Sequence, residues 1–157
     1  MRKINDILKH CDIKEIIGDD NRLVSGLAFD SRKCTEGMAF FAIRGTQVDG
    51  HEFIAKVIDQ GCRIIVCEQV PSIQNDDVTY YVVENTAKSL GYAASEFYGR
   101  PSEKLRLVGV TGTNGKTTIA TLLYRLFYNA GYPCGLLSTI ENRINDIQVL
   151  LKELSQI

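Results

Sequence analysis

A glycine-rich run in the last third of the chain constrains the fold more than any other feature. Residues 105–118 read Leu-Arg-Leu-Val-Gly-Val-Thr-Gly-Thr-Asn-Gly-Lys-Thr-Thr. The apolar start predicts a buried strand over 105–110, and glycines at 109, 112 and 115 predict a turn. The amphipathic residues that follow predict a helix over 116–130. A strand, a glycine turn and a helix in this order are typical of a phosphate-binding loop.

The chemistry of such a loop comes from its backbone. Glycines let N–H groups converge on phosphate oxygens, and the helix adds its unpaired N–H groups and the positive end of its dipole. Lys116 is placed to reach the β- and γ-phosphates, and the Thr117 hydroxyl to bind Mg²⁺. The spacing departs from the pattern G-x-x-x-x-G-K-[ST], because Val110 stands where the first glycine belongs. The alternative is an ordinary strand–turn–helix corner with no ligand.

Composition indicates a globular chain and excludes some partners. The 157 residues are 45% hydrophobic and 24% charged, with a net charge of −1. This charge gives no electrostatic footprint for nucleic acid or for an anionic membrane. The N-terminus does not have the pattern of a signal peptide, and we expect a cytoplasmic protein. The five cysteines are odd in number and irregularly spaced, which favours free thiols in a reducing compartment: Cys11, Cys34, Cys62, Cys67 and Cys134.

The chain divides into two patterned regions that meet near residues 98–104, a polar stretch with Gly and Pro. We predict a small α/β domain over 1–100 and the start of a second domain over 101–157. Expected elements of the first are helices over 4–10, 51–60 and 86–98, the last capped by Asn85 or Thr86, and strands over 23–29, 38–43, 63–67 and 79–83.

The second region predicts one βαβ unit. A strand over 134–139 is expected to lie parallel to the strand over 105–110 after a right-handed crossover through the helix. A final helix is expected over about 147–155. Two strands and one crossover helix cannot cover both faces of a parallel sheet, so the domain is expected to be incomplete.

Two segments resemble the Mur ligases, which build the peptide stem of peptidoglycan. Val110–Thr118 is similar to the ATP loop of that family, and Phe29–Arg32 with Gly37–His51 is similar to its N-terminal UDP-binding domain. The resemblance covers roughly residues 20–146. It implies an α/β fold in which a small UDP-binding domain precedes the first βαβ unit of a Rossmann-like ATPase domain. Residues 97–102 favour members that add diaminopimelate or lysine to UDP-N-acetylmuramoyl-L-alanyl-D-glutamate.

The resemblance also implies the site residues and the partners. Lys116 is the expected catalytic residue and Thr117 the expected ligand of Mg²⁺. The expected partners are ATP and the UDP-N-acetylmuramoyl-dipeptide, with no nucleic acid and no membrane. ATP is expected to bind Gly112, Thr113, Asn114, Gly115, Lys116, Thr117 and Thr118, and the UDP end of the substrate to contact Phe29, Ser31, Thr46, Gln47, Val48 and Asn114.

The implied reaction is ATP-dependent amide formation through an acyl phosphate. After Asp146 the family pattern leads to a Thr-Thr-Pro type of stretch, whereas this chain continues with Ile147. We therefore expect an N-terminal fragment that does not ligate alone. Three alternatives stay open: the Mur ligase that adds D-alanyl-D-alanine, a non-catalytic UDP-sugar-binding module, and a P-loop NTPase that works as a switch.

Overall fold

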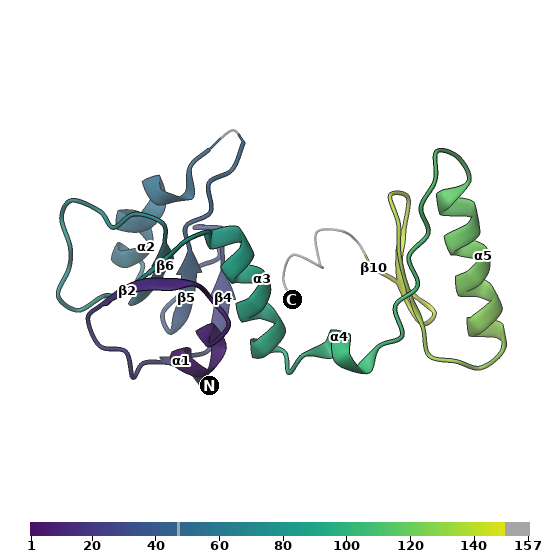
Figure 1. Ribbon diagram of the computed structural model, residues 1–157, viewed down its shortest axis with the longest axis horizontal. Helices are drawn as coiled ribbons and strands as arrows, with labels where there is room; N and C mark the ends of the chain where they lie inside the picture. Colours follow the sequence, from purple (N-terminus) through teal and green to yellow (C-terminus); the bar gives the residue numbers. More distant parts are fainter. Residues whose placement is uncertain (47, 150–157) are drawn as a thin grey trace. The chain divides into compact units, whose positions relative to one another are not determined.

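The computed structural model describes residues 1–46 and 48–149. For Val149 it describes the backbone alone. The chain separates into two compact units, the first spanning Met1–Leu105 and the second beginning at Arg106 (Figure 1). In the described ranges no helix is long and apolar enough to cross a membrane.

The first unit contains a five-stranded mixed sheet in the order β2-β7-β6-β5-β4. The four strands from β4 to β7 run parallel to their neighbours, and β2 pairs antiparallel with β7. The parallel strands place their carboxyl ends, and the loops that follow them, at one edge of the sheet. The bounds are Ile13–Ile17 for β2, Gly26–Ala28 for β4, Met38–Phe41 for β5, Ile64–Cys67 for β6 and Thr79–Val83 for β7.

Helices cover both faces of this sheet. One face packs against α1 and α3, and the other against α2, which follows a 3₁₀ turn, η1. A short antiparallel pair, β1 with β3, lies beside α1. The bounds are Arg2–Lys3 for β1, Ile4–Leu8 for α1, Leu23–Val24 for β3, Gly50–Phe53 for η1, Ile54–Asp59 for α2 and Thr86–Phe97 for α3.

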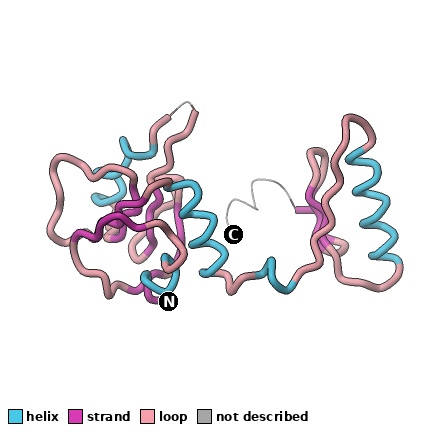
Figure 2. Tube along the Cα trace, viewed as in Figure 1, coloured by secondary structure: helices cyan, strands magenta, loops and turns pink. Residues whose placement is uncertain are grey.

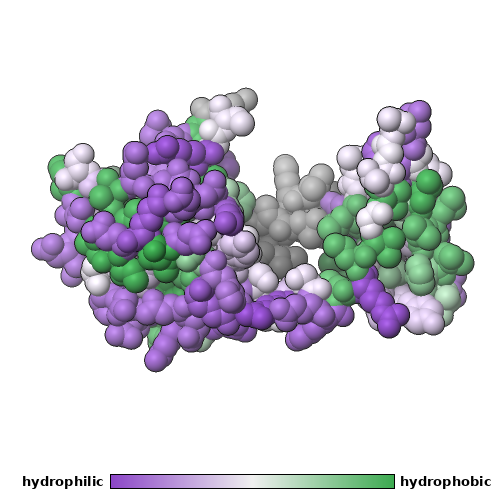
Figure 3. All heavy atoms as spheres, viewed as in Figure 1, coloured by the Kyte–Doolittle hydropathy of each residue, from purple (hydrophilic) through white to green (hydrophobic). Residues whose placement is uncertain are grey.

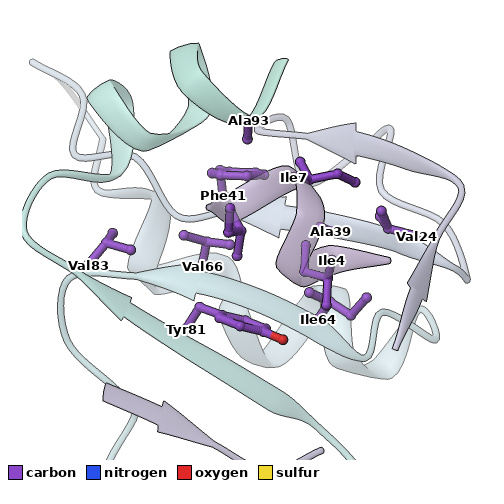
Figure 4. Close-up of a cluster of buried hydrophobic side chains, with 11 residues drawn as sticks. Ile4, Ile7, Val24, Ala39, Phe41, Ile64, Val66, Tyr81, Val83 and Ala93 are labelled. Carbon is purple, nitrogen blue, oxygen red and sulfur yellow. The ribbon is translucent and has the colours of Figure 1, made fainter. Parts of the chain in front are cut away.

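The core follows from the two-residue period of a strand. Phe41 packs with α1 and α3, whereas its neighbour Phe40 packs with α2, and both side chains are fully buried. Tyr81 and Tyr80 divide in the same way, and Figure 4 shows Tyr81, Phe41 and Ala93 in one cluster. Because both faces are covered, the inner strands β5 and β6 are apolar throughout, which explains their unbroken hydrophobic runs.

The predicted elements of the first unit are confirmed with shorter bounds in several cases, except that the strand predicted over 23–29 is two short strands, β3 and β4, in different sheets. Asn85 caps α3, since its side chain accepts the backbone N–H of Lys88 at 2.8 Å. Three elements were not predicted: the two-residue strand β1, the strand β2, and the short helix α4, Pro101–Lys104, in the join between the two regions.

The second unit contains the helix α5, Lys116–Asn129, and a three-stranded antiparallel meander in the order β10-β9-β8. The strands are Gly135–Leu137 for β8, Asn142–Ile144 for β9 and Ile147–Val149 for β10. Asn145, with φ of 49°, makes the tight turn between β9 and β10.

The βαβ prediction for this unit is wrong in its details. Residues 105–110 form no strand, and Figure 2 draws the segment that leads into α5 as loop. The strand predicted near 134–139 pairs antiparallel with β9, not parallel with 105–110. Two tight turns bring β8, β9 and β10 together locally, whereas a parallel pair needs a long crossover. The helix predicted over 147–155 is wrong at 147–149, which form β10, and its remainder lies outside the described residues.

The second unit also exposes apolar side chains, which Figure 3 shows gathered over α5. Leu107 is 90% exposed, Leu126 63% and Leu122 59%. On α5 only Tyr124 is buried. An apolar face of this kind is typical of a surface that packs against further protein.

Candidate functional site

The first group of predicted site residues lies at the carboxyl ends of β4 and β5, two adjacent parallel strands. Phe29 directly follows β4, and 51% of its surface is exposed. Ser31 is buried, with 7% exposure, and its hydroxyl makes no hydrogen bond within the described residues. The fold therefore brings the two segments that carry Phe29, Ser31, Thr46 and Val48 to the same edge of the sheet, the edge at which open α/β sheets bind ligands.

Asp30 holds the turn that contains Ser31. Its carboxylate accepts the backbone N–H of Arg32 at 3.0 Å and pairs with the Arg32 guanidinium through two bonds of 2.9 and 2.7 Å. These hydrogen bonds lower the pKa of Asp30 to about 2. Asp30 is thus engaged in the turn, while the Ser31 hydroxyl between the two residues has no partner in the described part of the chain.

The loop after β5 closes on itself. Arg44 and Asp49 form an isolated antiparallel bridge, and the N–H of Gly45 donates to the carbonyl of Val48 at 3.0 Å. Thr46 is exposed, and Val48 is 52% exposed. Gln47, predicted to contact UDP, lies outside the described residues. The loop is therefore closed at its base, the neck formed by Arg44 and Asp49, while Thr46 and Val48 are exposed to solvent.

A polar cluster connects this neck to the end of β6 and to the start of α3. We call the residues Arg44, Asp49, His51 and Glu68 the loop bracket. Asp49 Oδ1 lies 2.6 Å from His51 Nδ1, and the Glu68 N–H donates to His51 Nε2 at 2.9 Å. The Arg44 guanidinium lies 3.5 Å from Asp49 Oδ2 and 3.4 Å from Glu68 Oε2. Glu68 Oε1 also accepts the N–H of Thr86, the first residue of α3, at 3.1 Å.

Sequence reasoning missed most of this bracket. It treated His51 as a residue that starts a helix, and His51 does lie in η1, but both of its ring nitrogens are bonded. Glu68 was not singled out. The available signal was its position directly after the buried strand β6, at the carboxyl edge of the sheet.

The second group of predicted site residues lies in the loop before α5. Gly112 and Gly115 have φ of 147° and 74°, a left-handed backbone that favours glycine. The backbone N–H groups of residues 112–118 donate no hydrogen bond to any described residue. Lys116 turns its ammonium group back onto the loop, where it donates to the carbonyls of Gly112 at 2.5 Å and Thr113 at 3.2 Å.

The side chains of this loop are open to solvent. Thr113, Asn114, Lys116 and Thr118 are exposed, and Thr117 is half-buried without a hydrogen bond to any described residue. The structure therefore brings together unpaired backbone N–H groups, one ammonium group and one hydroxyl at the start of a helix. Such a set of groups suits a polyphosphate with its Mg²⁺.

Models of two domains match the chain. The model described as "Mur ligase family, catalytic domain" matches residues 23–98, and "Mur ligase middle domain" matches residues 110–156. Together they include every residue of the two groups described above.

Curated relatives share half of their aligned residues with the chain. The UDP-N-acetylmuramoyl-L-alanyl-D-glutamate--2,6-diaminopimelate ligase of Cytophaga hutchinsonii is 50% identical over 145 residues, which is 92% of this chain and 30% of that protein. The ligase of the same name from Phocaeicola vulgatus is 49% identical over 144 residues, again 92% of this chain and 30% of the relative. The chain thus spans about a third of the length of these relatives.

Solved structures agree with the fold. A UDP-N-acetylmuramoyl-L-alanyl-D-glutamate--2,6-diaminopimelate ligase superposes with a TM-score of 0.67 at 21% identity, over 94% of this chain and 29% of that one. MurF from Acinetobacter baumannii gives a TM-score of 0.59 at 23% identity, over 82% of this chain and 28% of that one. With the domain models and the identity to curated relatives, the result is clear: the chain belongs to the Mur ligase family.

Proposed function

We propose that the chain is the substrate- and nucleotide-binding N-terminal part of a ligase that adds diaminopimelate to UDP-N-acetylmuramoyl-L-alanyl-D-glutamate. The printed name of the relatives at 49% and 50% identity supports this activity. The same name disfavours the ligase that adds D-alanyl-D-alanine. In this proposal residues 1–100 bind the UDP end of the substrate, and residues 101–157 begin the ATP-binding domain.

The UDP end of the substrate binds at the carboxyl edge of the parallel sheet. Phe29 offers an exposed ring, and Ser31 a hydroxyl without a partner among the described residues. Thr46, Gln47 and Val48 line the uracil pocket from the loop after β5. The support is geometric, because β4 and β5 are neighbours and end at the same edge. Asn114 contributes a further contact to the nucleotide substrate.

One observation carries the ATP part of the proposal: the run of N–H groups over residues 112–118 that have no acceptor among the described residues, with the Lys116 ammonium beside it. Exposed N–H groups at the start of a helix have no partner within the helix and are open to a ligand, so such a run suits an anion with several oxygens. ATP supplies the phosphoryl group that activates the substrate carboxylate. The loop N–H groups and Lys116 hold and neutralise its phosphates, and Thr117 offers its hydroxyl to Mg²⁺.

Binding and ligation are separate activities in this proposal. Phosphoryl transfer needs positioned charge around the phosphates, and amide formation also needs a site for the incoming amino acid. The residues assigned in this proposal hold UDP and ATP, and none of them is assigned to the incoming amino acid. We therefore propose that the 157-residue chain binds its ligands and does not ligate.

Calorimetry on the 157-residue chain tests the proposal with three ligands: UDP, the UDP-N-acetylmuramoyl-dipeptide, and ATP with Mg²⁺. We expect saturable binding of each and no release of ADP when they are combined with diaminopimelate. Binding of UDP without ATP would favour the non-catalytic UDP-sugar-binding module. Binding of ATP without UDP would favour the NTPase switch, and binding of neither would contradict the proposal.

A further inference from the structure

We propose that His51 is a positioning residue that fastens the UDP-binding loop to the parallel sheet. The inference rests on the proposed function, because it assigns the loop after β5 to the uracil pocket. The His51 side chain is only 14% exposed, and each ring nitrogen has one partner. Nδ1 faces Asp49, which closes the loop, and Nε2 faces the backbone of Glu68, directly after β6.

The two partners leave one protonation state that satisfies both. The Glu68 backbone N–H can only donate, so Nε2 must hold a lone pair. The Asp49 carboxylate can only accept, so Nδ1 must carry the proton. The backbone N–H of His51 also donates to Asp49 and holds the pKa of that carboxyl below its usual range. The bracket therefore requires neutral His51 with its proton on Nδ1.

This bonding excludes a role for His51 in proton transfer. A general base needs a free lone pair within reach of its substrate. The Nε2 lone pair accepts the backbone N–H of Glu68, and the Nδ1 proton is donated to the Asp49 carboxylate. Arg44 and Glu68 are the other charged groups of the bracket, and the Arg44 guanidinium pairs with the carboxylates of both Glu68 and Asp49. The ring is consequently a connector within the protein.

The connection limits how the loop can move. Asp49 is part of the neck that presents Thr46 and Val48, and Glu68 is bonded through its carboxylate to the start of α3. A loop that is held in place before the ligand arrives loses less conformational freedom on binding. His51 thus contributes to UDP affinity through the loop, without touching the ligand.

Nitrogen NMR of the imidazole rings tests the protonation state in the ligand-free 157-residue chain. The sequence holds two histidines, so the variant His10→Asn leaves the signals of His51 alone. We expect a neutral ring with the proton on Nδ1. A ring with its proton on Nε2, or an average of the two forms, would overturn the proposed bonding. This readout does not depend on any ligand.

Calorimetry with UDP tests the positioning role through two complementary variants. His51→Asn keeps a donor near Asp49 and loses the acceptor for Glu68, whereas His51→Gln keeps an acceptor near Glu68 and loses the donor for Asp49. We expect each variant to bind UDP about fivefold more weakly, in line with the loss of one hydrogen bond. His10→Asn is the matched control: His10 lies in the turn after α1, beside Glu96, and its replacement is expected to leave UDP affinity unchanged.

The temperature of the measurement separates positioning from stability. Binding is measured well below the thermal transition of each variant, where a purely structural role would lower the transition and leave UDP affinity unchanged. Wild-type affinity in both His51 variants would overturn the positioning role alone. Failure of the wild-type chain to bind UDP would overturn the UDP assignment, and the positioning role with it.

Discussion

Lys116 Nζ donates to the carbonyl oxygen of Gly112 at 2.5 Å, across the loop that precedes α5. The ammonium group is thereby held over a loop whose own N–H groups have no acceptor in the described residues. Carbonyl oxygens are weaker partners for an ammonium group than phosphate oxygens, because only the latter carry formal charge. We therefore expect Lys116 to exchange these carbonyls for the phosphates when ATP binds.

The first prediction concerns that exchange. Lys116→Met keeps the length of the side chain and removes the charge, and it is expected to weaken ATP binding about 10-fold to 100-fold. UDP affinity should not change. Calorimetry of the 157-residue chain measures both. Lys104→Met in α4 is the control, since the Lys104 side chain has no bonded partner among the described residues; an equal loss of ATP affinity in the control would rule out a specific role for Lys116.

The second prediction concerns the turn at Asp30. Because its pKa is lowered to about 2, chiefly by the hydrogen bonds from the Arg32 side chain, ionised Asp30 stabilises the fold above the ordinary pKa near 4. That contribution is lost as the pH falls through about 2. In Arg32→Gln the Asp30 titration should move up toward pH 4, and carboxyl-carbon NMR measures it. Arg106→Gln, which lies in the second unit, should leave the Asp30 titration in place.

The third prediction compares one substitution at a buried and at an exposed site. Ile65 in β6 is fully buried against α2, and Ile73 in the loop after β6 is 89% exposed. Ile65→Ala should lower the free energy of unfolding of the first unit by about 2–5 kcal/mol. Ile73→Ala should change it by less than about 0.5 kcal/mol. Urea denaturation followed by circular dichroism measures both, and similar losses in the two variants would contradict the assigned core.

The first unit was predictable because its signals are local and agree with one another. Phe40 and Phe41 stand in an unbroken apolar run that only a strand covered on both faces can bury. Asn85 marks the start of α3 by a side-chain cap that depends on residues a turn away. β2 was missed because Ile13–Ile17 carries two charged residues, although its isoleucines are typical of a strand.

The second unit was harder to predict, because an apolar run becomes a strand only where a partner strand lies beside it. Leu107 and Val108 have the composition of a buried strand, yet in the described residues no strand lies beside them, and both side chains are exposed. The turn at Asn145-Asp146 was the overlooked signal, since an Asn-containing pair between apolar residues is typical of a two-residue hairpin. Local antiparallel pairing followed from it.

The candidate site likewise has one part that could be predicted from the sequence and one part that could not. The loop before α5 could be predicted because its glycines, Lys116 and Thr117 are contiguous in the sequence. The loop bracket could not, because His51 and Glu68 are 17 residues apart and meet only through the order of the parallel strands. The roles of the predicted ligand-binding residues stay predictions, which the variants described above test.

The fourth prediction uses two glycines with opposite surroundings. A Cβ on Gly50 would lie 2.6 Å from the carbonyl oxygen and 2.7 Å from the backbone nitrogen of Ile43, whereas a Cβ on Gly91 in α3 would meet nothing within 4 Å. Real Cβ atoms do not approach backbone atoms so closely, so Gly50→Ala must displace the start of η1 or the segment at Ile43 that follows β5. We expect lower stability of the first unit and weaker UDP binding, because the loop that carries Thr46 and Val48 ends at Gly50.

Gly91→Ala should instead raise stability by about 0.5–1 kcal/mol, since alanine favours a helix interior, and it should leave UDP affinity unchanged. Thermal unfolding and calorimetry on both variants measure these effects, and wild-type behaviour of Gly50→Ala would show that the close approach at Ile43 does not fix the loop.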